Sequence, residues 1–206
     1  MNYKTFVTGP IETNTYLVWS GQEAGIIDPG GPVADIIRFV EDNRLTLKWI
    51  VNTHGHADHI AGNSLILEKY QVPIAIHEQD RVMLTSADHN LSTFMGTPLV
   101  SPDATIVLTD SAQISLGDAT LQVLATPGHT KGSISLYGNG LLFAGDTLFY
   151  QSIGRTDLPG GDYQEIITSI ERKLLPLPPE TVVLPGHGCD TTLAHEHDFN
   201  PFIKLK

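Results

Sequence analysis

The chain of 206 residues carries 12 Lys and Arg against 23 Asp and Glu, a formal net charge of −11, and it contains one cysteine. This length predicts one domain with a substantial core. A single cysteine excludes a disulfide framework and cysteine-rich zinc modules, and the acidic balance argues against nucleic acid and anionic membranes as partners. No apolar segment resembles a signal peptide or approaches the ~20 residues of a membrane span, so we expect a cytoplasmic protein.

The first 77 residues alternate between short strands and helices. Runs rich in β-branched and aromatic residues, separated by Gly and Pro turn signals, predict strands at 3–8, 15–19, 24–28, 48–53 and 72–77. Apolar residues at helical spacing predict helices at 33–44 and 60–71. The period of the apolar pattern therefore changes between neighbouring segments, which indicates a mixture of strands and helices.

Strands dominate the second half of the chain. One amphipathic segment predicts a helix at 163–175, and apolar runs predict strands at 105–110, 112–118, 119–126, 133–138, 141–146 and 181–185. Residues 78–102 predict one or two short helices and then a loop that could cover a site. Two blocks of strands with helices outside them favour a four-layer αββα sandwich of the α/β class over a doubly wound parallel sheet. The chain shows no linker, so we expect a single domain over residues 1–206.

The strongest local signal follows an apolar strand, in the sequence THGHADH that begins at Thr53. It places three His and one Asp within six residues, and imidazole is the commonest metal ligand. His54 and His56 share one side of an extended segment, whereas Asp58 and His59 come as the chain turns into a helix and can point elsewhere. One short loop could therefore supply ligands to two neighbouring metal ions.

Three later segments are built alike, with an apolar strand followed by Gly and a ligand-type side chain. They carry His129 in TPGHT, Asp146 in AGDT and His187 in LPGHG, and the neighbouring Gly lets backbone approach closely. Taken singly, each of these side chains also fits a core, surface or turn position. Together with the first cluster they make five His and two Asp, a set that suits two divalent ions sharing a carboxylate.

The order of these motifs, H-x-H-x-D-H, PGHT, GDT and PGHG, resembles the metallo-β-lactamase superfamily. Within it, the chain is most similar to the glyoxalase II-like thioester hydrolases, the hydroxyacylglutathione hydrolases. The resemblance runs from Gly9 to about Phe202 and includes TNTYLV, IIDPGG, GDTLF, GRTDLPGGD and a terminal NPF. The fold that it implies is the same αββα sandwich.

The resemblance also implies a complete set of ligands for two divalent metal ions. It assigns His54, His56 and His129 to the first metal, Asp58, His59 and His187 to the second, and Asp146 to the bridge between them. It further implies that Asp58 orients a metal-bound hydroxide and that Asp28 supports a ligand His or the loop. A turn-capping role before Pro-Gly is the alternative for Asp28. Zinc is the expected metal, with iron or manganese as alternatives.

The reaction that the resemblance implies is hydrolysis of a small-molecule thioester such as S-lactoylglutathione to a hydroxy acid and a thiol, by attack of metal-bound hydroxide. The GRTD stretch and the first His cluster also resemble the persulfide dioxygenases of the same superfamily. Those enzymes use one iron, held at positions that match His54, His129 and Asp146. The retained PGHGCDTT segment favours the hydrolase. A metal-binding protein without activity is a further alternative, and the filled ligand positions argue against it.

The chain departs from the two-domain glyoxalase II enzymes in the parts that bind glutathione. Only about 19 residues follow His187, so we expect the short single-domain branch, without the C-terminal helical extension that carries basic residues. Arg155 is the candidate for binding a substrate carboxylate, and an ion pair with Asp157 or Asp162 is its alternative. Cys189 is interpreted as incidental, and a reactive thiol near the pocket is its alternative. The sequence contains no signal for the oligomeric state.

Overall fold

Alternating side chains build the central layers of the fold. In β2 (Thr13–Ser20), Tyr16 and Val18 pack in one apolar cluster while Leu17 between them packs in another. Successive side chains of a strand point to opposite faces of its sheet. Both faces of this strand are therefore covered, which explains why it reads as a continuous apolar run.

The computed structural model describes residues 1–203 and contains two six-stranded sheets. The first sheet has the order β1-β2-β3-β4-β5-β6, in which β1 to β3 are antiparallel neighbours and β3 to β6 are parallel. Besides β2, its strands are β1 (Asn2–Thr8), β3 (Glu23–Ile27), β4 (Thr46–Val51), β5 (Ile74–His77) and β6 (Ile106–Leu108). Its helices are α1 (Ala34–Asp42), α2 (Ala57–Ile60), α3 (Asn63–Leu67) and α4 (Arg81–Thr85), with a 3₁₀ turn at Glu78–Asp80.

The second sheet has the order β14-β13-β10-β9-β8-β7. β7 to β10 are antiparallel neighbours, and β10 and β13 are parallel. The strands are β7 (Gln113–Leu116), β8 (Ala119–Ala125), β9 (Ile134–Gly138), β10 (Leu141–Gly145), β13 (Val182–Pro185) and β14 (Thr191–Thr192). The remaining elements are the hairpin β11 (Leu148–Phe149) and β12 (Ser152–Ile153), α5 (Tyr163–Ser169) with a π-helical turn at Ile170–Leu174, and α6 (Leu193–Phe199).

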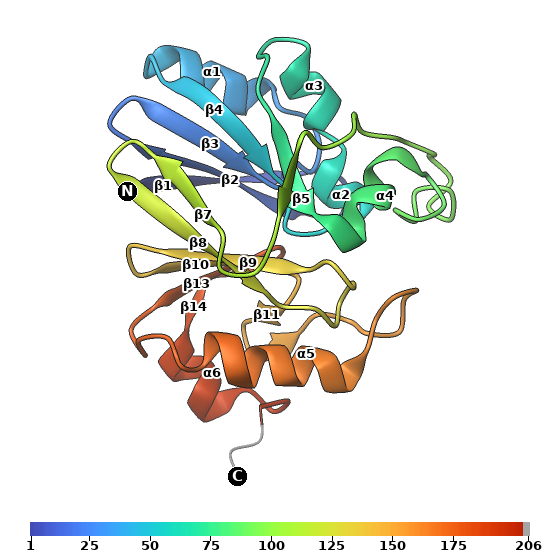
Figure 1. The fold of residues 1–206 in the computed structure, drawn as a ribbon, viewed down its shortest axis with the longest axis vertical. Coiled ribbons are helices and arrows are strands. Elements are labelled where there is room, and N and C mark those ends of the chain that lie inside the picture. The colour runs from blue at the N-terminus through green and yellow to red at the C-terminus, as the bar shows by residue number, and fades with distance from the viewer. Residues whose placement is uncertain (204–206) are drawn as a thin grey trace.

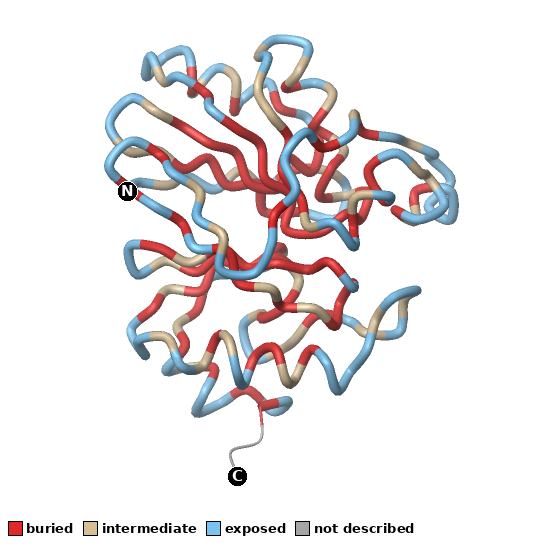
Figure 2. The backbone as a smooth tube through the Cα atoms, in the orientation of Figure 1, coloured by how far each residue is buried: buried red, intermediate tan, exposed pale blue. Residues whose placement is uncertain are grey.

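The two sheets face each other, with α1 and α3 outside the first and α5 and α6 outside the second (Figure 1). One apolar cluster fills the space between the two sheets. A second lies between the first sheet and its helices, and a third lies between the second sheet and its helices. Figure 2 shows the strands buried along most of their length, while the helices alternate between buried and exposed residues. The prediction of a four-layer αββα sandwich is therefore confirmed. Within the described residues, no helix is long and apolar enough to cross a membrane.

The single helix predicted at 60–71 is wrong. The structure forms two short helices there, α2 and α3, because Gly62 packs tightly where they meet. Its N–H donates to the carbonyl oxygen of Pro29 at 2.6 Å, and a Cβ on Gly62 would lie 2.8 Å from that oxygen. The next residue, Asn63, is buried, and its Nδ2 donates hydrogen bonds to Asn52 Oδ1 and to Ser101 Oγ, each at 2.9 Å. This polar contact turns the chain inward and interrupts the helical period.

A buried carboxylate fixes α6, which lies outside the predicted elements. Glu196 is fully buried and accepts hydrogen bonds from Thr191 Oγ1 at 2.7 Å, from the backbone N–H of Gln151 at 2.9 Å and from Asn200 Nδ2 at 2.7 Å. Asn200 Nδ2 also donates to the carbonyl oxygen of Ser152 at 3.0 Å. The network therefore ties α6 to the hairpin β11–β12.

Replacing Glu196 with alanine is expected to lower the free energy of unfolding by about 3 kcal/mol. Three donors would lose their acceptor, and each buried donor without a partner costs ~1–3 kcal/mol. Urea unfolding measures this change in free energy. Glu171→Ala is the matched control, because Glu171 is exposed in the π-helical turn. Its free energy of unfolding should change by less than about 0.5 kcal/mol. Equal stabilities of the two variants would contradict the role given to this network.

Candidate metal centre

The seven side chains expected as metal ligands lie at one edge of the sandwich, where strands of both sheets end. β4, β10 and β13 each end immediately before a ligand segment, and β8 runs parallel to β10 because both are antiparallel to β9. The carboxyl ends of these strands therefore meet, as in other α/β proteins whose sites lie at that edge. The loop after β4 and helix α2 carry His54, His56, Asp58 and His59, and the segments after β8, β10 and β13 carry His129, Asp146 and His187.

His54, His56 and His129 form a first group. His56 Nδ1 and His129 Nε2 are 2.9 Å apart, and the His54 ring lies 4.8 Å from each of the other two rings between centroids. One ligand atom from each residue lies within 4.8 Å of the others. All three side chains are buried, so the group is a compact cluster of imidazoles.

Asp58, His59 and His187 form a second group beside the first. His59 Nε2 and His187 Nε2 are 3.3 Å apart, and Asp58 Oδ2 lies 3.2 Å from the former and 3.1 Å from the latter. Thr13 Oγ1 donates a hydrogen bond to the same Asp58 oxygen at 3.1 Å. Thr13 belongs to no motif in the sequence, and it reaches the second group because β2 begins at this edge of the first sheet.

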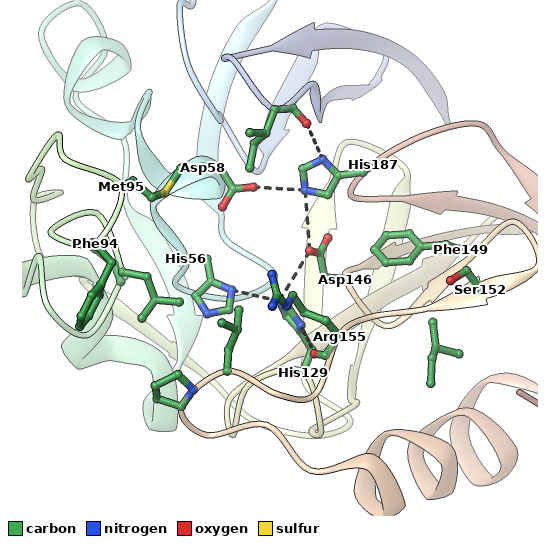
Figure 3. Close-up of a pocket in the computed structure, with 16 residues that line it drawn as sticks. His56, Asp58, Phe94, Met95, His129, Asp146, Phe149, Ser152, Arg155 and His187 are labelled. Atoms are coloured by element: carbon green, nitrogen blue, oxygen red, sulfur yellow. Dashed lines mark hydrogen bonds and ion pairs between the residues drawn. The ribbon is translucent and has the colours of Figure 1, made fainter.

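Asp146 lies between the two groups and reaches both (Figure 3). Its Oδ2 is 3.6 Å from His129 Nε2 in the first group and 3.7 Å from His187 Nε2 in the second. Its Oδ1 is 3.4 Å from His59 Nε2. This is the position that a carboxylate shared by two metal ions requires.

Hydrogen bonds on the far sides of the rings aim three ring nitrogens at the centre. The Nδ1–H of His129 donates to the carbonyl oxygen of Arg155 at 2.8 Å, and that of His187 donates to the carbonyl oxygen of Ile11 at 3.1 Å. His59 Nδ1 donates to Asp28 Oδ2 at 3.0 Å. Each partner fixes the tautomer whose Nε2 carries a lone pair, as it does for metal-binding histidines.

The donor atoms fit divalent metal ions. His54 Nε2, His56 Nε2 and Asp146 Oδ1 are buried without a hydrogen-bond partner, which is costly for polar atoms unless something else satisfies them. Nε2 of His59 and Nε2 of His187 lie 3.3 Å apart, so that a metal ion bound by both nitrogens would take the place of a proton shared between them. Imidazole and carboxylate donors suit zinc, iron and manganese. The His and Asp clusters thus indicate a dinuclear metal site.

The electrostatics of the site agree with this donor chemistry. Burial lowers the pKa of His54 well below its usual value, and burial together with neighbouring His129 lowers the pKa of His56 to about 3. Burial also opposes a charge on His59, but the carboxylates of Asp58, Asp146 and Asp28 outweigh it and raise the pKa of His59. His54 and His56 are therefore neutral, whereas the carboxylates around His59 favour a positive charge there.

Asp28 holds both His59 and the loop that carries His54 and His56. Its Oδ1 accepts from the backbone N–H of Thr53 at 2.7 Å, and its Oδ2 accepts from Thr53 Oγ1 at 2.6 Å and from His59 Nδ1. Asp28 is buried and has a left-handed φ of 51°, a conformation that Asp and Asn adopt more readily than most residues. Its position is that of a supporting residue at the end of β3.

Asp80 is a second supporting carboxylate that the sequence analysis missed. Its Oδ2 accepts from Thr130 Oγ1 at 2.6 Å and from the backbone N–H of Gly55 at 3.2 Å, and its Oδ1 accepts from the backbone N–H of Gly132 at 2.8 Å. It therefore joins the loop of His54 and His56 to the loop of His129. Burial raises the pKa of Asp80, against these hydrogen bonds, which favour the ionised form.

A cavity of about 800 Å³ opens beside the metal centre. The segment that follows α4, within the loop expected to cover a site, contributes Asn90, Leu91, Phe94 and Met95 to its lining. Asn90 is buried, and its Nδ2 donates to the carbonyl oxygens of Met83 and Leu99 at 3.0 and 3.1 Å. The base of the segment is therefore anchored, while Phe94 and Met95 remain largely exposed at its tip.

Arg155 also lines the cavity and forms the ion pair with Asp157 that was expected as its alternative role. Arg155 Nε and Nη2 each lie 2.8 Å from a carboxylate oxygen of Asp157 and lower the pKa of Asp157 to about 2. Asp162 instead caps α5 by accepting from the backbone N–H of Glu165. Because the Arg155 and Asp157 side chains are 61% and 69% exposed, the pair contributes little to stability, and Arg155 can exchange Asp157 for another carboxylate.

Cys189 is exposed and does not belong to the residues that line the cavity. This position agrees with its interpretation as incidental to the site. Four histidines outside the sequence motifs, His77, His89, His195 and His197, also do not line the cavity.

Several solved structures resemble this fold along nearly the whole chain. The B3 metallo-β-lactamase BLEG-1 superposes with a TM-score of 0.94 at 39% identity, covering 99% of this chain and 100% of the other. TTHA1623 in a di-iron-bound form gives a TM-score of 0.86 at 34% identity, covering 97% and 100%. ETHE1 from Myxococcus xanthus gives a TM-score of 0.82 at 30% identity, covering 98% of this chain and 84% of the other.

Curated relatives match the sequence along nearly its whole length. The chain is 37% identical over 206 residues to "Probable metallo-hydrolase YqgX" of Bacillus subtilis, with 98% of each protein covered. It is 34% identical over 213 residues to "Hydroxyacylglutathione hydrolase GloC" of Haemophilus influenzae, with 100% of each covered. The family described as the metallo-beta-lactamase superfamily matches residues 8–187. The chain therefore belongs to the metallo-β-lactamase superfamily.

Proposed function

We propose that this protein is a metal-dependent hydrolase that cleaves thioesters, with S-lactoylglutathione as the representative substrate. The observation that carries the proposal is the position of Asp146, whose carboxylate lies 3.4–3.7 Å from histidine nitrogens of both groups. The full-length similarity to GloC supports the substrate class. In this proposal, the first metal binds His54, His56 and His129, the second binds Asp58, His59 and His187, and Asp146 bridges them.

Two bound divalent ions would supply Lewis acidity for the thioester carbonyl and lower the pKa of water at the site toward neutrality. Asp58 would orient the attacking water, because Thr13 Oγ1 already holds the Asp58 carboxylate in place. Arg155 would bind a carboxylate of the substrate by leaving Asp157. A departing thiol with a pKa near ~8.5 leaves as thiolate, so the reaction needs no dedicated general acid.

The test is to purify the protein, determine its metal content and measure S-lactoylglutathione hydrolysis. We expect two divalent ions per chain, with zinc as the proposed metal, and a kcat/KM of at least about 10⁴ M⁻¹ s⁻¹. A chelator should remove the ions and lower the rate at least about a thousandfold, because metal ions supply several kcal/mol of transition-state stabilisation. Adding back zinc, iron or manganese separately identifies the metal that restores activity.

Two other activities are measured with the same preparation. Oxygen uptake on glutathione persulfide with one iron per chain would overturn the hydrolase in favour of a dioxygenase that uses His54, His129 and Asp146. Hydrolysis of a cephalosporin is the second candidate, because BLEG-1, a B3 metallo-β-lactamase, superposes so closely. A cephalosporin rate above the thioester rate would replace the proposed substrate class while leaving the two-metal site intact.

A further inference from the structure

The cavity beside the metal centre has a wide apolar wall. Phe94 and Met95 lie on one side of the centre, and Phe149 lies on the opposite side (Figure 3). Phe94 is 80% exposed and Met95 is 50% exposed, although neither residue is needed to hold a metal. Covering such side chains with an apolar group removes their surface from water, which is favourable. An apolar ligand group placed between these walls would therefore be bound strongly.

The same cavity offers little to a highly charged ligand. Apart from the proposed metal ligands, Arg155 is the one charged side chain among its described lining residues. Arg155 can pair with one carboxylate, whereas the glutathione half of a thioester carries two carboxylates and an ammonium group. The remaining polar side chains of the wall, Asn90 and Ser152, are neutral, and Nδ2 of Asn90 is already used to hold the Met83 and Leu99 carbonyls.

The apolar wall is also attached firmly enough to select a substrate. Phe149 belongs to β11 of the hairpin whose turn is held by Glu196, and its ring lies 6.4 Å from the His187 ring between centroids. On the other side, the tip that carries Phe94 is anchored at its base by Asn90 and by Ser92, whose Oγ accepts from the Leu99 N–H at 2.9 Å. The two walls thus flank the reacting centre.

From this arrangement we infer that the preferred substrates are thioesters with an extended apolar acyl group, which lies against Phe94, Met95 and Leu91. The inference rests on the proposed thioester hydrolysis and adds its specificity. Water adds to the carbonyl carbon and the C–S bond breaks. Of the two protons of the water, one is taken up by the thiolate and the other is released to solvent as the acid leaves as carboxylate. No oxidant or further reactant is needed.

The test compares glutathione thioesters that differ only in the acyl group: lactoyl, acetyl, butyryl and hexanoyl. For the unmodified protein we expect kcat/KM to rise about fourfold per methylene added from acetyl to hexanoyl, since each buried methylene is worth ~0.8 kcal/mol. Phe94→Ala should lower the ratio of the hexanoyl to the lactoyl value at least about fivefold. Phe199→Ala is the control, because its phenyl ring is 63% exposed on α6 and does not line the cavity. In this variant the ratio of the hexanoyl to the lactoyl value should stay unchanged.

The outcomes separate this inference from the proposed function. The apolar specificity is overturned if all four thioesters are hydrolysed at similar kcat/KM. It is also overturned if Phe94→Ala lowers kcat/KM equally for the hexanoyl and lactoyl thioesters. Either result leaves thioester hydrolysis standing. Absence of hydrolysis for every thioester by the metal-loaded protein overturns the proposed function and the inference together. A chain-length dependence that disappears in Phe94→Ala but persists in Phe199→Ala supports the inference.

Discussion

Replacing His59 and His187 together with alanine is expected to abolish thioester hydrolysis, with a loss of at least about a thousandfold in kcat/KM. The two Nε2 atoms lie 3.3 Å apart beside Asp58, and in the proposed assignment they are two of the three ligands private to the second metal. Several kcal/mol of transition-state stabilisation depend on that ion, and each 1.36 kcal/mol is tenfold in rate. The metal content should fall from two ions to one per chain.

This double variant also distinguishes the two enzyme chemistries that the sequence left open. A dioxygenase with one iron at His54, His129 and Asp146 would keep its oxygen uptake, because none of those residues changes. Circular dichroism of the metal-free proteins checks that the fold is retained. His197→Ala, an exposed histidine paired with Asp198 outside the cavity, is the control and should keep full activity. Thioester hydrolysis that survives the double substitution would disprove the two-metal mechanism.

The layers of the fold were predictable because each strand carries its own burial pattern. Leu17 faces the helices while Tyr16 and Val18 face the opposite sheet, and such runs are visible in the sequence as short apolar segments. The hairpin β11–β12 was not predictable in the same way, because strands of two residues show no periodicity. Its position depends on Glu196 of α6 and on Asn200, which directly follows α6, both more than 40 residues later in the chain.

The proposed ligands were predictable because they follow strands in short motifs, but their supports were not. His129 and Asp146 each stand beside a Gly after an apolar run, a local signal. Asp80 contacts Gly55, Thr130 and Gly132 from distant parts of the chain, and nothing in its own neighbourhood marks it. The available signal is topological: Asp80 closely follows β5, the parallel neighbour of β4, so it lies at the same sheet edge as the His54 loop.

The second large effect is expected from Asp28→Asn, which should weaken metal binding about 10- to 100-fold, the usual cost of losing the partner of a ligand histidine. Asn tolerates the left-handed φ of 51° at this position, so the backbone need not change. Oδ1 and Oδ2 of Asp28 accept from the Thr53 N–H and from His59 Nδ1 respectively. An amide has one oxygen, and therefore one of these donors must face an NH₂ group.

If the NH₂ group faces His59, the imidazole proton moves to Nε2, the atom that points at Asp58 and Asp146, and that lone pair is lost to the metal. Titration against a competing chelator measures the metal affinity, while urea unfolding in excess chelator measures any change in the fold itself. Asp42→Asn, the same substitution at an exposed position at the end of α1, should leave both values unchanged. An unaltered metal affinity in Asp28→Asn would mean that the chain positions His59 through Asp58 and Asp146 alone. In that case Asp28 would serve only the Thr53 loop.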